Sequence, residues 1–379
     1  MLPSPAFDCC DSRGITLAVT PHVLYVGSGP TVPALRARPA GLVSGSEACS
    51  AGIIRAMSND NAVALSPTIR VAAIQMVAEL GDVDANLAMA ERLVRVACER
   101  GANCVILPEL FSSGNAFFPH MASATRAIDG PPARVLLDLA RDGNAIVGGS
   151  FLAWRDGNVY NSFVLALPDG STHRHDKDAP TFWENCYYIG GNDDGVLPTP
   201  QGNIGAGLCW EFIRSRTAAR LKGKVAIVVG GSGWWGRKDS GQSDDPSPGF
   251  GLEIMKATPS RFARMLGVPV VHAAHAGRFG GQSWPDSGES YPSRYLGEAQ
   301  IVDGNGRILA RMSREEGEGV ITADVTLGPV ADEPDAIPDS FWIAEFPEAV
   351  YRQWESDLET GHQYYLSTTL PYVREMFTR

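Results

Sequence analysis

Four residues of this chain carry side chains that could do chemistry together: Glu109, Lys177, Glu184 and Cys209. Glu109 and Cys209 each end a short apolar run that is typical of a strand, and Lys177 closely follows a third such run and a turn. In a layered α/β protein, strand ends that point the same way bring distant residues into one crevice. A thiol, an ammonium and two carboxylates in one crevice are the parts for acyl-type chemistry through a thioester.

The elements that must position these residues follow a βα-like order that begins near residue 69. Their apolar periodicity and turn signals predict strands at residues 70–76, 104–108, 145–153, 158–167, 171–175, 205–209, 225–229, 268–274, 298–302, 307–312 and 319–325. The same signals predict helices at residues 83–100, 132–142, 212–221 and 257–266. Strands alternate with helices, but two hairpins are interleaved. This order favours an α/β fold with one mixed sheet, or two sheets with helices outside.

The two ends of the chain differ from this central part. Residues 1–67 are rich in Pro, Gly, Ser and Ala with poor periodicity, which predicts a disordered extension. An alternative is that the biological chain starts at Met57, just before the first strong strand. Residues 328–379 form a tail rich in aromatic side chains, which we expect to pack on the core or at a subunit interface.

Composition and charge narrow the function classes. The chain has 379 residues and a formal net charge of -11, without a basic stripe, which argues against a nucleic-acid partner. No apolar run reaches the roughly 18 residues of a membrane helix, and the N-terminus lacks the pattern of a secretory signal. Seven cysteines at irregular spacing, without a CxxC pair, do not suggest a disulfide framework. We therefore expect neither nucleic acid nor membrane as a partner, and a reducing, cytoplasmic setting.

Several motifs together resemble the carbon–nitrogen hydrolases of the nitrilase superfamily over roughly residues 68–327, which we expect to form the hydrolase domain. In chain order the motifs are residues 70–76, Leu-Pro-Glu109, Lys177 with Glu184, Gly-Leu-Cys209-Trp-Glu211 and residues 295–310. The resemblance implies a four-layer αββα sandwich of two mixed sheets with outer helices. It also implies association into homo-oligomers, dimers or larger.

Within the superfamily, the sequence is most similar to the nitrilase branch. Cys209-Trp-Glu follows the nucleophile strand as in nitrilases, and the segment from Lys177 to Glu184 resembles a nitrilase Lys-x-x-Pro-Thr-x-x-Glu motif. Two features depart from the pattern: His175-Asp precedes the lysine where Arg is more usual, and Phe212-Ile-Arg stands where nitrilases often have Asn-Tyr. These departures bear on the substrate class more than on the chemistry.

The resemblance gives each polar residue a role. Cys209 would be the nucleophile, activated by Glu109 as the general base that later activates water. Lys177, with the backbone N–H after Cys209, would hold the negative charge of the tetrahedral species. Glu184 would orient Lys177 or carry a proton to the leaving ammonia. Glu211 competes for that role, and the alternative is that Glu211 anchors the loop after the nucleophile.

A second set of residues is predicted to bind the substrate. Aromatic walls would suit an apolar or aryl substrate. The candidates are Trp183, Trp210, Glu211, Trp234 and Trp235.

We predict neither a metal nor a cofactor. His272 and His275 have an HxxH spacing, but on a strand residues three apart point to opposite faces. The Gly-rich stretches form neither GxGxxG nor a P-loop, so no nucleotide is expected.

These observations favour a hydrolase that converts a small-molecule nitrile into a carboxylic acid and ammonia through a cysteine thioimidate and thioester. An amidase or N-carbamoyl hydrolase could use the same four residues. A non-catalytic ligand-binding or scaffold protein with a vestigial site, and a metallohydrolase, remain as alternatives of other classes.

Overall fold

The computed structural model describes residues 67–118, 120–236, 250–282, 290–329, 333–346 and 348–379. All described residues belong to one compact unit. The predicted N-terminal extension, except Pro67, and the alternative start at Met57 lie outside the described residues.

Within the described residues, thirteen strands form one branched, hydrogen-bonded sheet. They are β1 (Thr68–Met76), β2 (Cys104–Ile106), β3 (Arg126–Ala127), β4 (Ile146–Arg155), β5 (Asn158–Ala166), β6 (Thr172–Asp176), β7 (Val196–Leu197), β8 (Ile204–Leu208), β9 (Ile227–Ser232), β11 (Val270–His275), β14 (Ala299–Val302), β15 (Ile308–Met312) and β16 (Gly319–Thr326). A smaller sheet contains β10 (Trp235–Gly236), β12 (Arg278–Gln282) and β13 (Ser290–Tyr295).

The helices of the same residues are α1 (Val83–Glu99), α2 (Pro131–Gly143), α3 (Ser215–Leu221), α4 (Phe250–Leu266), α5 (Glu348–Tyr364) and α6 (Leu370–Thr378). Short 3-10 turns are η1 (Met121–Ala124), η2 (Phe182–Cys186), η3 (Cys209–Ile213) and η4 (Arg314–Glu316), and a π turn, η5 (Tyr365–Thr369), joins α5 to α6.

Strand direction determines where the candidate residues meet. The strands β4, β2, β1, β11, β9 and β8 pair in parallel in that order. β6 is two antiparallel pairings away from β4, so it runs the same way. The carboxyl ends of β2, β6, β8 and β9 therefore lie along one edge, where open α/β sheets place their ligands.

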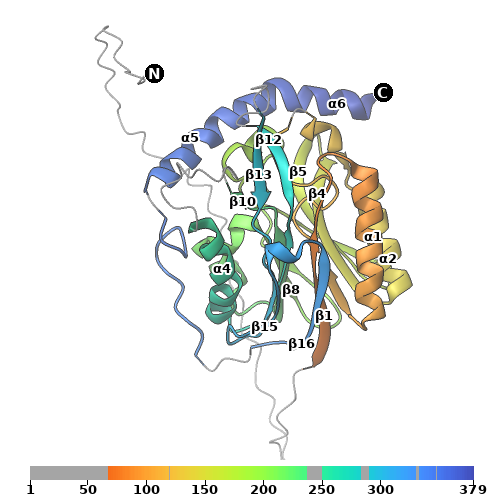
Figure 1. Cartoon of the computed structure of the whole chain (residues 1–379), viewed down its shortest axis with the longest axis vertical. Helices are drawn as coiled ribbons and strands as arrows, with labels where there is room; N and C mark the ends of the chain where they lie inside the picture. Colours follow the sequence, from red (N-terminus) through yellow and green to blue (C-terminus); the bar gives the residue numbers. More distant parts are fainter. Residues whose placement is uncertain (1–66, 119, 237–249, 283–289, 330–332, 347) are drawn as a thin grey trace, which may run out of the picture. The chain divides into compact units, whose positions relative to one another are not determined.

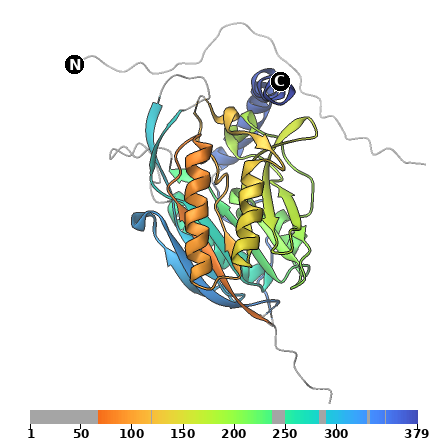
Figure 2. The same cartoon turned by 90° about the vertical axis from the view of Figure 1, so that its right-hand side faces the viewer.

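The helices cover the outside of the strands. α1 and α2 lie side by side on one face (Figure 2), and α4 lies on the opposite side of the strands (Figure 1). The side chain of Asp82 caps α1 by accepting a hydrogen bond of 3.0 Å from the N–H of Ala85. The helix predicted at residues 83–100 is confirmed, and the apolar side chains of one face are buried: Leu87, Ala90, Leu93, Val94 and Ala97.

Three apolar cores separate these parts. Leu136 and its neighbours fill the space between α1, α2 and one limb of the sheet. The sheet has two limbs, one ending in β1 and the other in β11, and the short β1–β11 pairing joins them. Val71 and Val271 belong to an apolar cluster between these limbs. Phe262 lies in a third cluster beneath α3 and α4. The predicted mixed α/β arrangement with outer helices is confirmed.

The helix predicted at residues 212–221 is wrong in one respect, because it is interrupted. Arg214 has extended backbone angles, between η3 and α3. Here the chain pairs with a segment of the tail: Ser215 N donates to Phe341 O at 3.1 Å, and Ile343 N donates to Ile213 O at 2.8 Å. Long-range pairing therefore overrides the local helical pattern.

The C-terminal tail is largely helical and contacts the segment around η2. Trp354 Nε1 on α5 donates to Pro180 O at 3.1 Å, and Thr369 Oγ1 donates to Cys186 O at 2.6 Å. Figure 1 shows α5 and α6 along one end of the strands. α5 packs against η2, so the helix lies next to the segment that carries Glu184.

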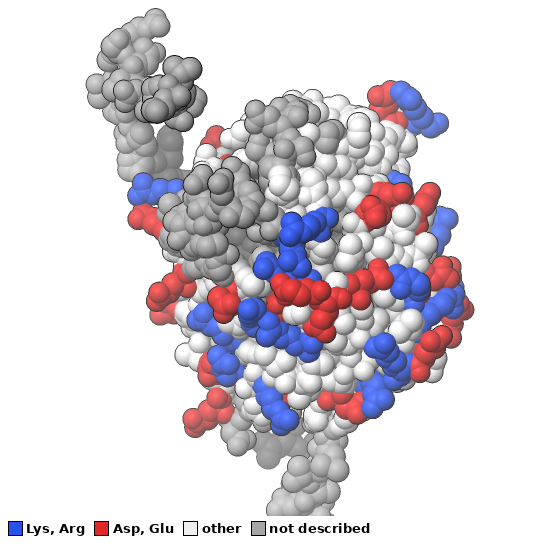
Figure 3. All heavy atoms as spheres, in the orientation of Figure 1, with Lys and Arg blue, Asp and Glu red and all other residues white. Residues whose placement is uncertain are grey.

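The surface is mixed in charge. Figure 3 shows Lys and Arg side chains interspersed with Asp and Glu on the face in view, as expected for a chain without a basic stripe. Among the described helices, none has the length and apolar character needed to cross a membrane.

Candidate active site

Glu109 lies just after β2, fully buried, with its carboxylate held from several sides. Lys177 Nζ donates to Glu109 Oε1 at 2.7 Å, and Asn161 Nδ2 donates to the same oxygen at 2.9 Å. The backbone N–H of Gly233, after β9, donates to Oε2 at 2.9 Å. A carboxylate at the end of an apolar strand is therefore buried with partners, as its desolvation cost requires.

Lys177 follows β6 and lies between two carboxylates. Its ammonium contacts Glu109 and, also at 2.7 Å, Glu184 Oε2. Glu184 belongs to η2, where the N–H of Thr181 donates to Oε2 at 2.8 Å and the Tyr188 hydroxyl donates to the same oxygen. The two carboxylates thus hold the Lys177 ammonium between the end of β2, which Glu109 follows, and η2, which carries Glu184.

Cys209 follows β8 and begins η3, as the strand-to-turn position predicts. Its backbone has a positive φ of 50°, which non-glycine residues rarely adopt and which is often found at functional sites. The thiol is buried, and the Glu109 carboxylate is near enough to raise its pKa. The structure therefore brings all four residues together: Glu109, Lys177, Glu184 and Cys209.

The protonation states follow from burial and charge. Burial, together with the neighbouring Glu109 carboxylate, raises the pKa of the Cys209 thiol well above its usual value. Burial also raises the pKa of Glu109. Burial opposes the charge of Lys177, but the Glu109 and Glu184 carboxylates outweigh it and raise the pKa of the ammonium well above its usual value.

These pKa shifts are consistent with a thiol that loses its proton only when it attacks a substrate. The resting thiol keeps its proton, the Glu109 carboxylate lies near it, and Lys177 remains a cation that acts on both. Burial opposes ionisation of Glu184, yet Lys177 and the other donors hold its pKa below the usual range. The arrangement can transfer a proton from sulfur to Glu109 and offer a positive charge to a developing anion.

Three supporting residues escaped the sequence reasoning. Asn115 Nδ2 bridges the two carboxylates, at 3.4 Å from Glu109 Oε2 and 3.0 Å from Glu184 Oε1. Asn161 lies on β5 and Tyr188 follows η2, and both donate to these carboxylates. Isolated Asn and Tyr residues carry no spacing signal, so contacts across the fold are needed to find them.

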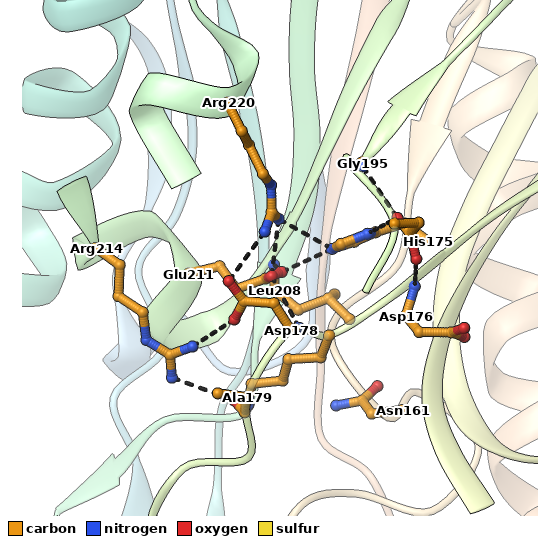
Figure 4. A network of polar contacts seen from close by, with 12 residues as sticks. Asn161, His175, Asp176, Asp178, Ala179, Gly195, Leu208, Glu211, Arg214 and Arg220 are labelled. Carbon is orange, nitrogen blue, oxygen red and sulfur yellow. Dashed lines mark hydrogen bonds and ion pairs between the residues drawn. The ribbon is translucent and has the colours of Figure 1, made fainter. Parts of the chain in front are cut away.

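Glu211 does not contact Lys177. Its carboxylate accepts hydrogen bonds from Leu208 N, His175 and Arg220, and it is fully buried (Figure 4). This placement favours the loop-anchoring alternative over both substrate binding and the role shared with Glu184.

The tryptophans separate into two groups. Trp210 is 3% exposed and packs against Phe182, Trp234 and Trp342, with ring centroids 4.9, 5.7 and 5.2 Å apart. Trp234 is half-buried in the same cluster, which also contains Cys209. Trp210 is therefore a buried packing residue of the cluster that contains Cys209, and part of the Trp234 side chain in that cluster stays accessible.

Trp183 and Trp235 lie in a different apolar cluster. Both rings pack against Phe117, with centroids 5.2 and 5.6 Å away. Phe117 was not among the residues predicted from the sequence. Its ring connects the segment after Glu109 to the segment that carries Glu184.

The two histidines of the HxxH spacing have separate partners. His272 Nε2 lies 2.8 Å from Ser232 Oγ, and His275 Nε2 donates to the backbone oxygen of Glu109 at 2.7 Å. In the part of the chain that the structure describes, no group of three or more His, Cys, Asp or Glu could hold a metal ion.

With this geometry established, similarity to known proteins becomes informative. A family model described as carbon-nitrogen hydrolase matches residues 70–333. The chain belongs to the carbon–nitrogen hydrolase family. Its relatives and structural neighbours place this carbon–nitrogen hydrolase in the nitrilase superfamily, which confirms the resemblance seen in the sequence.

The relatives of this carbon–nitrogen hydrolase carry both nitrilase and amidase names. It is 28% identical to nitrilase 1 of Arabidopsis thaliana over 300 residues, covering 72% of this chain and 82% of that protein. It is 33% identical to a nitrilase of Pyrococcus abyssi, covering 42% of this chain and 63% of the relative. It is 34% identical to omega-amidase NIT2 of Mus musculus, covering 38% of this chain and 56% of the relative. The matched stretches of the last two span less than two thirds of those relatives.

Solved structures agree on the fold. A carbon–nitrogen hydrolase from Helicobacter pylori G27 is similar with a TM-score of 0.58 at 18% identity, covering 83% of this chain and 99% of that chain. An amidase from Nesterenkonia AN1 is similar with a TM-score of 0.54 at 18% identity, covering 76% of this chain and 97% of that chain.

Proposed function

We propose that this carbon–nitrogen hydrolase converts a nitrile into a carboxylic acid and ammonia through covalent intermediates on Cys209. The observation that carries the proposal is the buried pairing of Lys177 with both Glu109 and Glu184, near the buried thiol of Cys209. Burying an ammonium between two carboxylates has a large desolvation penalty, which apolar side chains in the same place would not have. The arrangement therefore favours a catalytic role over a purely structural one.

The first half of the reaction forms a thioimidate. Glu109 takes the thiol proton as the Cys209 sulfur bonds to the nitrile carbon, and the nitrile nitrogen is protonated in turn. Lys177 lies 2.7 Å from Glu109 and supplies positive charge where negative charge develops.

The second half consumes two water molecules. Glu109 activates the first, which adds to the thioimidate carbon, and the tetrahedral species expels ammonia to leave a thioester. On addition, Glu109 passes the water proton to the nitrogen. As the C–N bond breaks, the leaving ammonia takes a second proton from Lys177, which Glu184 orients, and the hydroxyl proton of the tetrahedral species returns through Glu109 to Lys177. The second water cleaves the thioester C–S bond, releases the acid and returns the proton to Cys209.

An amide or N-carbamoyl substrate is the second candidate. Such a substrate would enter at the tetrahedral stage and use the same four residues. The names of the relatives favour this alternative as well, because they include omega-amidase and N-carbamoylputrescine amidase beside nitrilase. The half-buried Trp234 beside Cys209 supports an apolar or aryl group on either substrate.

Steady-state assays with matched nitriles and amides test the proposal. Ammonia release from an aryl nitrile and an aliphatic nitrile, absent in Cys209→Ala, is the expected result. Ammonia release from the matching amides alone would assign the chain to the amidase alternative. Hydrolysis that persists in Cys209→Ala would contradict both.

The wider organisation is also a proposal. We propose that residues 68–327 form the catalytic unit in a four-layer αββα arrangement, supported by the three apolar cores between helices and strands. We propose further that the chain forms a homo-oligomer, dimeric or larger. Four exposed apolar side chains on the tail support this: Leu366, Tyr372, Met376 and Phe377. Light scattering after size exclusion gives the mass, and a monomer at micromolar concentration would contradict the oligomer.

A further inference from the structure

A buried charged network lies beside the four proposed catalytic residues without being part of them. It joins three cations and three carboxylates, and Figure 4 shows most of the members converging from three segments of the chain. The members are His175, Asp178, Asp193, Glu211, Arg214 and Arg220.

Glu211 connects the two segments that carry the nucleophile and the ammonium. Its Oε2 accepts a hydrogen bond of 2.8 Å from the backbone N–H of Leu208, the residue before Cys209. Its Oε1 accepts a hydrogen bond of 3.1 Å from the backbone N–H of Asp178, the residue after Lys177. One side chain therefore ties together the backbone next to the sulfur and the backbone next to the ammonium.

His175 and Arg220 hold that carboxylate in place. His175 Nε2 lies 2.9 Å from Glu211 Oε2, and Arg220 donates to Oε1 at 2.8 Å. Burial disfavours the charged form of His175, but Glu211 and Asp193 outweigh it and raise the pKa of the imidazole to about 10. At neutral pH the ring is therefore a cation that donates to a carboxylate on each side.

Asp178 extends the same connection to α3. Its carboxylate accepts from Arg214 at 2.5 Å and from Arg220 at 2.9 Å, and Arg214 is fully buried. Arg220 thus bridges Asp178 and Glu211, so the residue after Lys177 is held through both its backbone and its side chain.

The backbone at Cys209 needs such support. A positive φ at a non-glycine residue is strained and persists where surrounding contacts hold it. A displacement of about 1 Å between reacting groups can cost on the order of 100-fold in rate. We infer that Glu211, held by His175 and Arg220, is a positioning residue that fixes Cys209 relative to Lys177. The inference rests on the proposed function, in which these two side chains act on one substrate.

The test compares two substitutions of buried, arginine-paired glutamates. Glu211→Gln removes the charge of the connecting carboxylate and converts one of its acceptor oxygens into a donor. The matched control is Glu298→Gln, because Glu298 is equally buried and pairs with Arg311 but contacts neither Leu208 nor Asp178. Thermal unfolding of both variants measures how much stability is lost when a buried, arginine-paired carboxylate is neutralised.

Two readouts report on position. The first is the separation of kcat from KM: in Glu211→Gln we expect kcat to fall by about 100-fold while KM changes by less than about threefold. The second is the pH midpoint of Cys209 alkylation by iodoacetamide, followed by mass spectrometry. A sulfur that has moved away from the Lys177 ammonium should show a midpoint higher by at least about half a pH unit.

The possible outcomes distinguish failure of the positioning role of Glu211 from failure of the proposed hydrolase function. Unchanged kcat and alkylation midpoint in folded Glu211→Gln, or changes equal to those of Glu298→Gln, would overturn the positioning role. If wild-type Cys209 is alkylated but no nitrile or amide is hydrolysed, the proposed function fails, and the midpoints still decide the positioning role.

If Glu211→Gln does not fold, His175→Gln replaces it. This variant removes one cation but keeps a side-chain donor for Glu211. In His175→Gln we expect kcat to fall and the pH midpoint of Cys209 alkylation to rise, both by less than in Glu211→Gln. An alkylation midpoint equal to that of the wild type would overturn the inference.

Discussion

At the scale of single residues, the site is defined by one cation among anions. Lys177 contacts Glu109 and Glu184 at equal distances of 2.7 Å, and Cys209 adds a thiol that becomes negative in the proposed mechanism. The proposed mechanism gives the ammonium two tasks: it keeps two carboxylates compatible in a buried site, and it offers positive charge to the substrate.

Lys177→Met tests both parts. Without the cation the two carboxylates repel each other, so the pair takes up a proton and Glu109 no longer accepts one from Cys209. We expect kcat/KM to fall by about 10²–10³-fold, the range typical for removing one donor to a developing anion. The measurement is steady-state kinetics at a temperature where circular dichroism shows both proteins folded.

Lys256→Met provides the control for that change. Lys256 lies on α4, pairs with the exposed Glu253 and is remote from the four residues in sequence and in contacts. It should keep wild-type kinetics. A folded Lys177→Met with activity close to that of Lys256→Met would contradict the role given to Lys177.

At the scale of elements, the sequence predicted what depends on local pattern. The strand ends after residues 104–108 and 205–209 place Glu109 and Cys209 as expected, and the buried face of α1 follows its periodicity. Prediction of the four-residue cluster needed only strand direction and the family motifs, because parallel strands bring their carboxyl ends to one edge.

What the sequence did not predict depends on contacts far along the chain. The break at Arg214 arises because residues 341–343 pair with residues 213–215. The tail forms the helices α5 and α6 in the structure. In the sequence only the aromatic residues of this tail stood out, and no helix was predicted in it. The supporting roles of Asn115 and Tyr188 require the folded geometry, since neither residue has a distinctive spacing.

The helix α5 gives a prediction at this scale. Trp354 is buried, packs on Trp342 and donates to Pro180 O, four residues before Glu184. Trp354→Ala should lower the free energy of unfolding by about 3 kcal/mol, the lower end of the range for a large buried aromatic residue. It should also reduce kcat, because the segment of Glu184 loses its support.

Chemical denaturation and kinetics measure the two effects. Gln363→Ala is the control from the same helix, because this side chain is exposed and its loss should change stability by less than about 0.5 kcal/mol. Equal stability of the Trp354 and Gln363 variants would show that α5 does not support the site.

At the scale of the whole molecule, the buried ion network makes stability depend on pH. The folded pKa of His175 is raised to about 10 from an ordinary value of 6.5. A raised folded pKa stabilises the protein fully below the unfolded value, and this contribution declines as pH rises and is lost above the folded value. The affected window therefore runs from about pH 6.5 to about pH 10.

His175→Gln isolates this contribution. Across that window the wild type should lose stability relative to the variant by up to about 1.4 kcal/mol per pH unit. Urea denaturation of both proteins at several pH values measures the difference. A difference that stays constant between pH 6.5 and pH 10 would show that His175 does not titrate with folding.

The central claim is that Cys209 forms a covalent intermediate with a substrate carbon–nitrogen group. The most direct measurement is intact-protein mass spectrometry during turnover of an aryl nitrile, an aliphatic nitrile and their amides, with Cys209→Ala in parallel. The account predicts an adduct of thioimidate or thioester mass on the wild type, located on Cys209 and absent from the variant. Turnover without any adduct, together with undiminished turnover in Cys209→Ala, would contradict it.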